Sequence, residues 1–391
     1  MFSSRLPAAL QANALSRAVS RARREGRAFL DLTLSNPTRA GITYPEGWLL
    51  ALSAPGAAIY EPQPLGLPAA REAIAADYAR RGVEIPPEHI AVTSSTSEAY
   101  SLLFKLLCNP CAESVLIPAP SYPLFEHLTA LDGVRTGSYA LDYHGRWYMD
   151  LQSVDRQWTQ ETRALLAVSP NNPTGSILTT GELDDIDGRC ASREAALILD
   201  EVFADYPLDE EGRPIRNTGS GPARAALTFR LGGLSKSVAL PQVKLGWIAV
   251  EGPAHLVSAA VERLELLCDT YLSVSTPVQL AASALIASGA RTRELVHSRV
   301  RENYHRLGSL AGEYPSVNVL HADGGWSGVM RIPARASEEE IVLQLLEEDA
   351  VLVHPGFFFD FPQEAYLVIS LLPEPDVFRE GVHRVLERVD A

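Results

Sequence analysis

Lysine is scarce in this chain of 391 residues, and two of its three lysines stand eight positions apart. The three are Lys105, Lys236 and Lys244, so 31 of the 34 basic side chains are arginines (34 minus 3). Arginine stays protonated in proteins, whereas a lysine in a low-dielectric pocket can lose its proton and act as a nucleophile or base. The segment that holds Lys236 and Lys244 therefore predicts chemistry that needs an amine.

Polar side chains follow several short apolar runs that we interpret as strands of a parallel sheet. Thr93–Ser97 leads from one run into a helix, and Tyr122 follows the next; Ser169–Gly175, Asp200–Phe203 and Gly232–Lys236 have equivalent positions. In an open parallel sheet a ligand lies beyond the carboxyl ends of the strands, so these side chains are expected to share one crevice. The hydroxyls and free N–H groups of Thr93–Ser97 suit a phosphate, although such a segment can also be a plain N-cap.

These segments need a sheet that brings their strand ends together. Continuous runs of Val, Ile, Leu and Ala predict strands that helices cover on both faces. The expected strands are Ile90–Thr93, Ser114–Ile117, Ala164–Val168, Ala196–Leu199, Thr228–Leu231 and an antiparallel Gly246–Val250. The expected helices are Leu67–Arg81, Glu98–Leu107, Tyr122–Leu131 and Gly181–Arg189. We predict an α/β fold with a mainly parallel sheet.

The C-terminal third predicts a second, smaller α/β unit. A long helical region, Pro277–Leu307, is expected to break near Gly289. The strands expected after it are Val317–Leu320, Gly328–Ile332, Val351–Val353 and Tyr366–Leu371, and the helices are Glu338–Glu348 and Val377–Val389. At the N-terminus we expect a surface helix over 8–27 and a strand over Phe29–Leu34. The predicted large domain covers residues 46–285, and the small domain combines 1–45 with 286–391.

Composition excludes several classes of function. A net charge of -14 opposes binding to nucleic acid, and no apolar run reaches the 18 residues typical of a membrane span. Four cysteines in a chain of this length do not indicate a disulfide framework, and the pair Cys108 and Cys111 lacks the second pair that zinc would need. We expect a cytoplasmic protein without a metal.

The motifs together resemble the class I/II aminotransferases, which are fold type I enzymes of pyridoxal 5'-phosphate (PLP). Over almost the whole chain the family's segments occur in order: Ser35-Asn-Pro-Thr38, Tyr60-Glu-Pro-x-x-x-Gly66, Asn-Asn-Pro-Thr-Gly, Asp-Glu-Val-Phe and Ser-Lys-x-x-x-Leu-Pro. The resemblance implies an α/β fold with a mainly parallel, seven-stranded sheet, helices on both of its faces and a smaller α/β domain. It also implies a ping-pong transfer of an amino group from an amino acid to a 2-oxo acid through a lysine Schiff base.

The resemblance also assigns a role to individual residues. It implies that Lys236 forms the Schiff base and carries the proton, that Asp200 keeps the pyridine nitrogen protonated, and that Asn172 contacts the ring's phenolic oxygen. Tyr122 is expected to stack on the ring. The residues expected to hold the phosphate are Ser95, Thr96, Ser235 and Lys244, together with Tyr60 of a neighbouring subunit, which implies a homodimer.

Three positions depart from the family's pattern. Lys244 stands where an arginine usually grips the phosphate, and it keeps the charge without the fork of donors. Phe203 replaces a tyrosine that contacts the phenolic oxygen, which should raise the pKa of the Schiff base. Val368 stands where an arginine usually pairs with the substrate's α-carboxylate, and Arg39 and Arg331 are our candidates to replace it.

Other functions stay open at this point. The aromatic segment His354–Phe361 is expected either to favour an apolar substrate or to belong to the core of the small domain. The same fold also hosts C–S lyases, decarboxylases and amine-specific transaminases. The absence of an arginine at position 368 is compatible with one of these reactions. A non-catalytic PLP-binding relative is the third alternative, which the presence of Lys236, Asp200 and Asn172 opposes.

Overall fold

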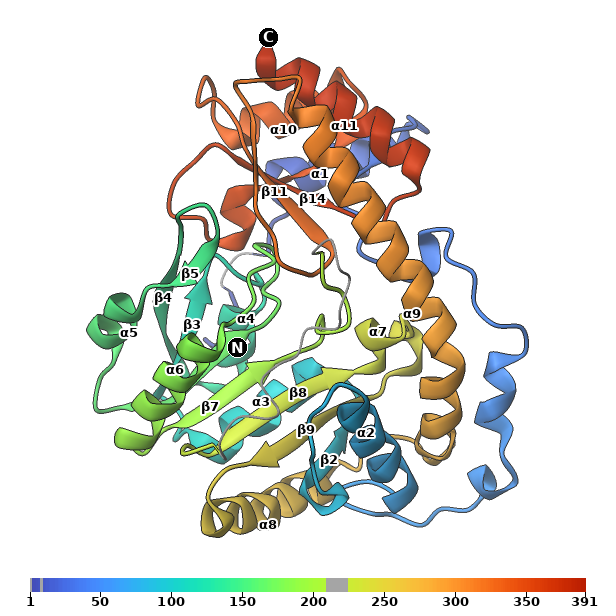
Figure 1. The fold of residues 1–391 in the computed structure, drawn as a ribbon, viewed down its shortest axis with the longest axis vertical. Coiled ribbons are helices and arrows are strands. Elements are labelled where there is room, and N and C mark those ends of the chain that lie inside the picture. The colour runs from blue at the N-terminus through green and yellow to red at the C-terminus, as the bar shows by residue number, and fades with distance from the viewer. Residues whose placement is uncertain (1, 8–9, 209–223) are drawn as a thin grey trace.

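The computed structural model describes residues 2–7, 10–208 and 224–391 of the chain. These residues form two main sheets of unequal size (Figure 1). Within these residues the larger sheet has eight strands, in the order β2-β9-β8-β7-β6-β3-β4-β5. They are β2 (Ile90–Thr93), β3 (Ser114–Ala119), β4 (Arg135–Tyr143), β5 (Trp147–Met149), β6 (Thr162–Val168), β7 (Ala196–Asp200), β8 (Thr228–Gly233) and β9 (Gly246–Glu251). β5 and β9 run in the direction opposite to the other six strands, so the predicted mainly parallel sheet is confirmed.

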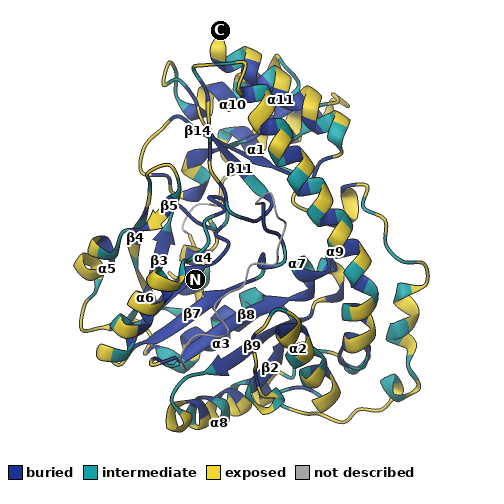
Figure 2. Ribbon diagram, viewed as in Figure 1, coloured by how far each residue is buried: buried dark blue, intermediate teal, exposed yellow. Residues whose placement is uncertain are grey.

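Helices cover both faces of the larger sheet because residues along a strand alternate between two apolar cores. In β6, Leu166 and Val168 pack into a core that includes residues of α3, α4 and α8, whereas Leu165 and Ala167 pack into a core shared with α6. The helices of this unit are α2 (Pro68–Arg80), α3 (Thr96–Leu107), α4 (Phe125–Asp132), α5 (Leu151–Gln157), α6 (Thr180–Ser192) and α8 (Ala254–Tyr271). Figure 2 shows the strands buried and the outward sides of the helices exposed.

The larger sheet has one strand more than the seven predicted, and β4, β5 and α8 lie outside the predicted ranges. β4 begins with exposed and half-buried residues, because it lies near the sheet edge and lacks a continuous apolar run. β5 has only three residues. α8 carries a readable signal, since its buried residues Val257, Ala260, Leu264 and Cys268 follow a spacing of three and four.

The smaller unit is built on a four-stranded antiparallel sheet in the order β10-β11-β14-β13. Its strands are β10 (Asn318–Leu320), β11 (Ser327–Arg331), β13 (His354–Pro355) and β14 (Tyr366–Ser370), and its helices are α10 (Glu338–Glu347) and α11 (Pro375–Asp390). The second α/β unit predicted from the C-terminal third is therefore confirmed. No helix within the described residues has the length and apolar character to cross a membrane.

The N-terminal segment joins this smaller unit. β1 (Leu30–Asp31) pairs parallel with β12 (Val351–Leu352), and the strand predicted over Phe29–Leu34 is therefore only two residues long. α1 (Ala14–Arg24) begins where the Asn13 side chain accepts a hydrogen bond from the N–H of Ser16 at 2.7 Å. The helix predicted over 8–27 is thus shorter than expected, and residues 8–9 of that prediction lie outside the described residues.

α9 (Thr276–Ala311) is a single helix that connects the two units along one side of the molecule (Figure 1). The predicted break near Gly289 is wrong. Gly289 is buried, and a Cβ there would lie 2.5 Å from the Cβ of Val238. Glycine therefore lets α9 approach the loop that follows Lys236, although glycine in a helix interior usually costs about 1 kcal/mol relative to alanine.

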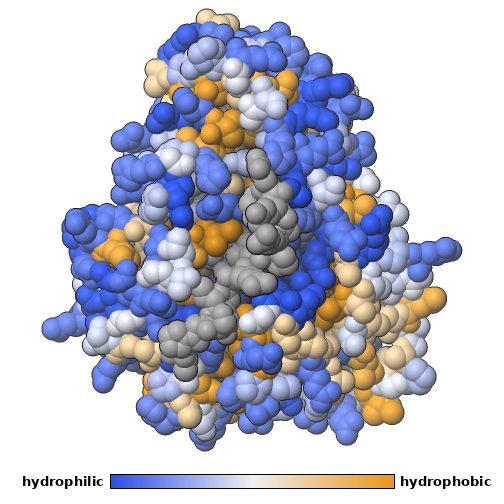
Figure 3. All heavy atoms as spheres, viewed as in Figure 1, coloured by the Kyte–Doolittle hydropathy of each residue, from blue (hydrophilic) through white to orange (hydrophobic). Residues whose placement is uncertain are grey.

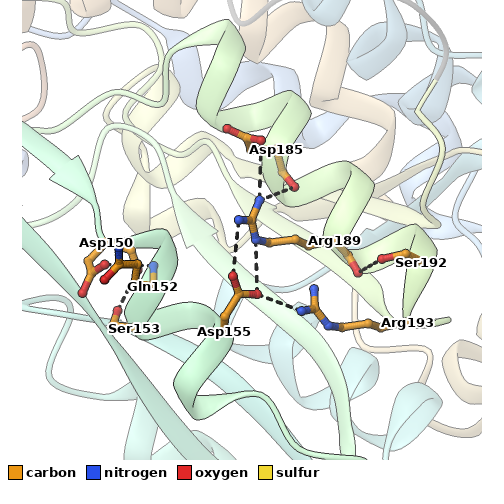
Figure 4. A network of polar contacts seen from close by, with 8 residues as sticks. All are labelled: Asp150, Gln152, Ser153, Asp155, Asp185, Arg189, Ser192 and Arg193. Carbon is orange, nitrogen blue, oxygen red and sulfur yellow. Dashed lines mark hydrogen bonds and ion pairs between the residues drawn. The ribbon is translucent and has the colours of Figure 1, made fainter.

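An exposed network of charges joins α5 to α6 on the outer surface (Figure 4). Asp155 of α5 accepts hydrogen bonds from Nη2 of Arg189 at 3.3 Å and from Nη2 of Arg193 at 2.8 Å. Arg189 also pairs with Asp185, one turn earlier in α6. Exposed ion pairs contribute about 0–1 kcal/mol each, so this network helps to fix two helices and is not a site for chemistry.

We expect Gly289→Ala to lower the Tm of the protein by a few degrees. Overpacking a core costs about 1–3 kcal/mol, which exceeds the helix-propensity gain of about 1 kcal/mol. Gly308→Ala is a matched control in the same helix, because a Cβ there meets nothing within 4 Å, and its Tm should stay unchanged or rise. Thermal unfolding followed by circular dichroism measures both. Equal Tm values for the two variants would contradict the packing role of Gly289.

Candidate active site

A cavity of about 310 Å³ lies at the carboxyl ends of the strands of the larger sheet and is closed on its other side by the smaller sheet. The larger unit lines it with Thr96, Tyr100, Tyr122, Asn172, Asp200, Phe203, Ser235 and Lys236. The smaller unit contributes Trp326, Ser327, His354, Phe359, Val368 and Ser370. Small-molecule sites have volumes of roughly 300–1,000 Å³, so the cavity can take a cofactor or a small substrate. The predicted crevice at the strand ends is therefore present.

Lys236 lies on α7 (Leu234–Ser237), the single helical turn that follows β8. Its Nζ lies 4.8 Å from the ring centroid of Trp326 and 5.5 Å from that of Phe203. Burial lowers the pKa of Lys236 to about 8, and the nearby charge of Asp200 opposes this shift. At neutral pH a fraction of this amine is therefore unprotonated, which a nucleophile or base requires.

Asp200 is the last residue of β7 and is buried against the same cavity. Burial raises its pKa to about 6. The Tyr100 hydroxyl and the N–H of Val202, at 3.0 Å, both donate to its carboxylate and work in the opposite direction. The arrangement provides a carboxylate that hydrogen bonds hold in place and that can pair with a positive charge inside the cavity.

The two consecutive asparagines after β6 have different roles. The Asn171 side chain is buried: its amide donates to the Pro120 carbonyl at 3.0 Å and to the Thr174 hydroxyl at 2.8 Å, so it holds the turn together. Asn172 lines the cavity, and its Oδ1 accepts a hydrogen bond from Ser327 at 3.3 Å. Of the pair, Asn172 is therefore the residue available to a ligand.

The serine and threonine segment lies at the N-terminus of α3, as predicted. The Ser95 hydroxyl accepts from the N–H of Glu98 at 3.2 Å and so caps the helix, while Thr96 and Ser235 line the cavity. A Cβ at Gly246 would lie 2.9 Å from the carbonyl carbon of Ser95, so glycine allows the start of β9 to approach this turn. Lys244, two residues earlier, is exposed and does not line the cavity.

Aromatic rings form much of the remaining wall. Tyr122 lines the cavity and packs edge-to-face on Phe125, with ring centroids 5.6 Å apart. Phe203 packs on Trp326 with centroids 5.4 Å apart. The hydroxyl of Tyr206 donates to the carbonyl of Lys236, so it does not replace the hydroxyl that Phe203 lacks.

The structure does not bring the two candidate arginines to the cavity. Val368 lines the cavity wall and is 2% exposed. Arg331 lies at the exposed end of β11, and Arg39 is exposed in the 3-10 turn Pro37–Arg39. Tyr60 also lies away from this cavity, with 76% of its surface exposed.

The cavity residues that were absent from our candidates include Tyr100, Trp326, Ser327 and Ser370. Tyr100 carried a signal, because it lies one helical turn after Thr96 and so shares its face of α3. The other three belong to the smaller sheet, whose placement over the strand ends could not be derived from strand patterns alone.

Comparisons with known proteins show the family and the fold of the chain. The sequence pattern of the family "Aminotransferase class I and II" matches residues 30–385. The chain belongs to this family. Its members use PLP, and the protein is accordingly a PLP-dependent aminotransferase, as the resemblance implied.

Individual relatives cover almost the whole chain. The glutamate-pyruvate aminotransferase AlaA of Escherichia coli strain K12 is 27% identical over 90% of this chain and 88% of its own length. The alanine aminotransferase of Mycobacterium tuberculosis strain H37Rv is 26% identical over 89% of this chain and 82% of its own. A solved alanine aminotransferase from Pyrococcus furiosus has the same fold, with a TM-score of 0.88, 24% identity and coverage of 99% of both chains.

The chemistry of the cavity fits PLP. An aldehyde needs an amine, a pyridine nitrogen needs an acid, and a phosphate needs the N–H groups of a helix start. Lys236, Asp200 and the first turn of α3 provide these three kinds of group around one cavity. The raised pKa of Asp200 also indicates a carboxylate without a full positive partner in the protein itself.

We expect Tyr100→Phe to move the acid limit of PLP binding to higher pH by about one to two pH units. The Tyr100 hydroxyl donates to Asp200 and lowers its pKa, so its removal raises that pKa and the carboxylate loses its charge at higher pH. A hydrogen bond to a charged group is worth about 1.5–3 kcal/mol, and one pH unit corresponds to about 1.4 kcal/mol. Absorbance titration with PLP across the acid range measures the change.

The control for this experiment is Tyr139→Phe. The Tyr139 hydroxyl is also buried, but it donates to the Leu166 carbonyl at 2.9 Å and does not line the cavity. This variant should bind PLP with the pH dependence of the wild type. If Tyr100→Phe behaves in the same way as Tyr139→Phe, the hydrogen bond to Asp200 does not set the charge of that acid.

Proposed function

We propose that Lys236 is the residue that holds the cofactor and moves the proton during amino transfer. The observation that carries this proposal is the pairing of an amine of pKa about 8 with an acid of pKa about 6 on the walls of one cavity. Lysine is the only side chain with a primary amine, and the two other lysines, Lys105 and Lys244, are both exposed.

In this proposal Asp200 and Asn172 orient the cofactor ring. When bound, PLP supplies an aldehyde that accepts the amino group and a ring that withdraws electrons from the substrate's α-carbon. The Asp200 carboxylate keeps a proton on the ring nitrogen, and the Asn172 amide donates to the phenolic oxygen. Tyr122 covers the ring face, and Phe203 lies close to Lys236 without offering a hydrogen bond.

Lys236 Nζ is suited to carry a proton because its surroundings do not stabilise a permanent charge. The rings of Trp326 and Phe203 flank it. A pKa of about 8 leaves roughly a tenth of the amine neutral at pH 7. When Lys236 is not bound to the cofactor, its Nζ would be free to take the proton from the substrate's α-carbon and deliver it to the cofactor carbon that carried the aldehyde.

The cofactor phosphate is proposed to lie at the N-terminus of α3. Thr96 and Ser235 line the cavity there, and the N–H groups of the first turn provide further donors. Ser95 supports the site as the cap of this helix. Lys244 supplies positive charge beside it, because Gly246 brings the chain close to the Ser95 turn.

We propose that the amino donor is an amino acid with a small or apolar side chain and that the acceptor is a 2-oxo acid. Two relatives are named as alanine and glutamate-pyruvate aminotransferases. The rings of Phe359, Trp326 and Tyr122 on the cavity wall support an apolar substrate. An amine-specific transaminase is the alternative that Val368 favours, because no arginine among the described residues lines the cavity.

The decisive experiment for Lys236 is borohydride reduction of the holoenzyme followed by mass spectrometry. We expect a pyridoxyl mass on the peptide that contains Lys236. Lys236→Ala should lose this mass and at least about 100-fold in kcat, the usual contribution of a positioned general base. Lys105→Ala is the control, because Lys105 is exposed and pairs with Asp132. A pyridoxyl mass on another peptide would refute the assignment.

Substrate class is tested in the same preparation by half-reactions. Amino acids and amines without a carboxyl group are added singly, and the loss of the cofactor's visible absorbance band is recorded. Bleaching by apolar amino acids, with turnover only after a 2-oxo acid is added, supports the proposal. Bleaching by the amines alone supports the amine-specific alternative.

We further propose that the protein works as a cytoplasmic homodimer, in which Tyr60 reaches the partner's phosphate site. Large apolar side chains are exposed along one segment beside α9: Leu49, Leu50, Ile59 and Tyr60. Figure 3 shows apolar residues gathered at the lower right, where Figure 1 draws this segment. An exposed apolar patch is typical of a subunit contact. Four unpaired cysteines support a reducing compartment.

In the proposed dimer, each phosphate site is shared by the two subunits, and this can be tested with two variants. Leu50→Glu should shift the sedimentation of the protein from dimer to monomer, because it places a charge in the apolar patch. Tyr60→Phe should keep the dimer but weaken PLP binding about 10-fold, although Tyr60 lies outside the cavity of its own chain. The control is Tyr148→Glu, which places a charge on the edge strand β5, outside the apolar patch. Unchanged PLP affinity in Tyr60→Phe would contradict a shared site.

The division into a large domain (46–285) and a small domain (1–45 with 286–391) also stays a proposal. One apolar core supports it, because Leu15 and Leu32 of the N-terminal segment pack with Val300, Leu367 and Phe378 of the C-terminal unit. The boundary then falls within α9, so the two domains share a continuous helix.

A further inference from the structure

No arginine among the described residues lines the cavity. His354 lies beside Val368, the position where the family usually has an arginine. β13 and β14 pair antiparallel, and in their register His354 lies directly opposite Val368. Residues opposite each other across an antiparallel pair point to the same face, with Cβ atoms about 4.5–5.5 Å apart. Both side chains line the cavity. A side chain at 354 can therefore serve the same part of the cavity as one at 368.

The His354 ring has hydrogen-bonding capacity that the described protein does not use. Its Nδ1 is buried, and no described residue donates to it or accepts from it. Its ring packs against Phe358 and Phe359, with centroids 5.8 Å apart in both cases. A buried polar atom without a partner is costly, so a ligand that forms a hydrogen bond with it would be stabilised there. Trp326 Nε1 is a second buried donor on the same cavity without a partner.

The other polar groups on this face of the small sheet are already engaged. Ser370, two residues after Val368, donates to the Leu34 carbonyl at 2.6 Å. Ser327, opposite Ser370 on β11, donates to Asn172 at 3.3 Å. The candidate arginines are exposed and lie outside the cavity wall. Besides the indole of Trp326, His354 therefore remains as the side chain of the smaller unit that lines the cavity with a buried hydrogen-bonding atom lacking a partner among the described residues.

We propose that His354 is the specificity-determining residue that binds the α-carboxylate of the amino acid substrate, in place of an arginine at position 368. The proposal rests on the proposed function, since it names the substrate contact of that same cavity. Burial lowers the pKa of His354, with the charge of Asp31 opposing this shift. The neutral ring offers one N–H donor, whereas a guanidinium offers a charged, two-pronged contact. We therefore expect weaker selection for a carboxylate than an arginine would give.

The first test replaces the ring nitrogens and keeps a planar ring. His354→Phe should raise the KM for the amino acid substrate about 10- to 100-fold with little change in kcat, because one hydrogen bond to a charged group is lost. His354→Gln, which keeps a donor, should show a smaller rise. His144→Phe, at an exposed turn between β4 and β5, is the control. A fall in kcat at constant KM in His354→Phe would overturn the proposal.

A second variant tests the register argument directly. His354→Ala combined with Val368→Arg should recover most of the KM lost in His354→Ala, because the two positions face the same part of the cavity. The PLP absorbance band of every variant is recorded first, so that loss of fold or cofactor is separated from loss of substrate binding. A double variant that binds PLP and shows no recovery would count against a shared carboxylate site.

A binding measurement separates this proposal from the proposed function. Isothermal titration calorimetry of the unreactive pair 3-phenylpropionate and 3-phenylpropan-1-ol with the holoenzyme compares a carboxylate with an alcohol of similar shape. The wild type should prefer the carboxylate, and His354→Phe should lose that preference. This result does not depend on turnover, so it holds even if the half-reactions fail. A wild type that binds both ligands equally, or a variant that keeps the preference, would overturn the role of His354.

Discussion

An amine and a carboxyl group share one buried cavity, and most of the site follows from the cost of placing them there. Burial pushes both toward their neutral forms, lowering the pKa of Lys236 to about 8 and raising that of Asp200 to about 6. Tyr100 and the N–H of Val202 retain charge on the acid by donating to it. The two groups can sit together because β7 and β8 are parallel neighbours that end at the same edge, with Asp200 paired to Leu231.

The acid beside Asp200 is paired within the protein and does not line the cavity. Glu201 points away from the cavity and forms a buried ion pair with Arg230, which also pairs with Glu251 at 2.8 Å. A buried charge without a partner would cost several kcal/mol, whereas a paired and hydrogen-bonded one is tolerated. One acid of the Asp200-Glu201 pair is thus neutralised inside the protein, and the other is left facing the cavity for a ligand.

The chemistry at the strand ends could be predicted from the sequence, because apolar runs followed by polar residues place side chains at one edge of a parallel sheet. Lys236, Asp200, Asn172 and Thr96 all line the cavity for this reason. The substrate end could not be predicted in the same way. Whether Arg331 or His354 faces the cavity depends on strand register and on how the small sheet lies over the large one, and a one-residue difference in register exchanges the two faces of a strand.

The positions that depart from the family's pattern are those whose proposed contacts could be made by more than one residue. In the proposed site, Lys236 and Asp200 both reach one cofactor ring from two adjacent strands, so neither could move without losing contact with that ring. A carboxylate contact has no such constraint, because β13 and β14 each present a side chain to the same end of the cavity and either position can hold the donor. In the proposed site, Lys244 has only to supply charge near a phosphate, which a flexible ammonium does over a range of positions. Geometry therefore restricts the ring contacts most strictly, and the substrate and phosphate contacts can be carried by residues of different type.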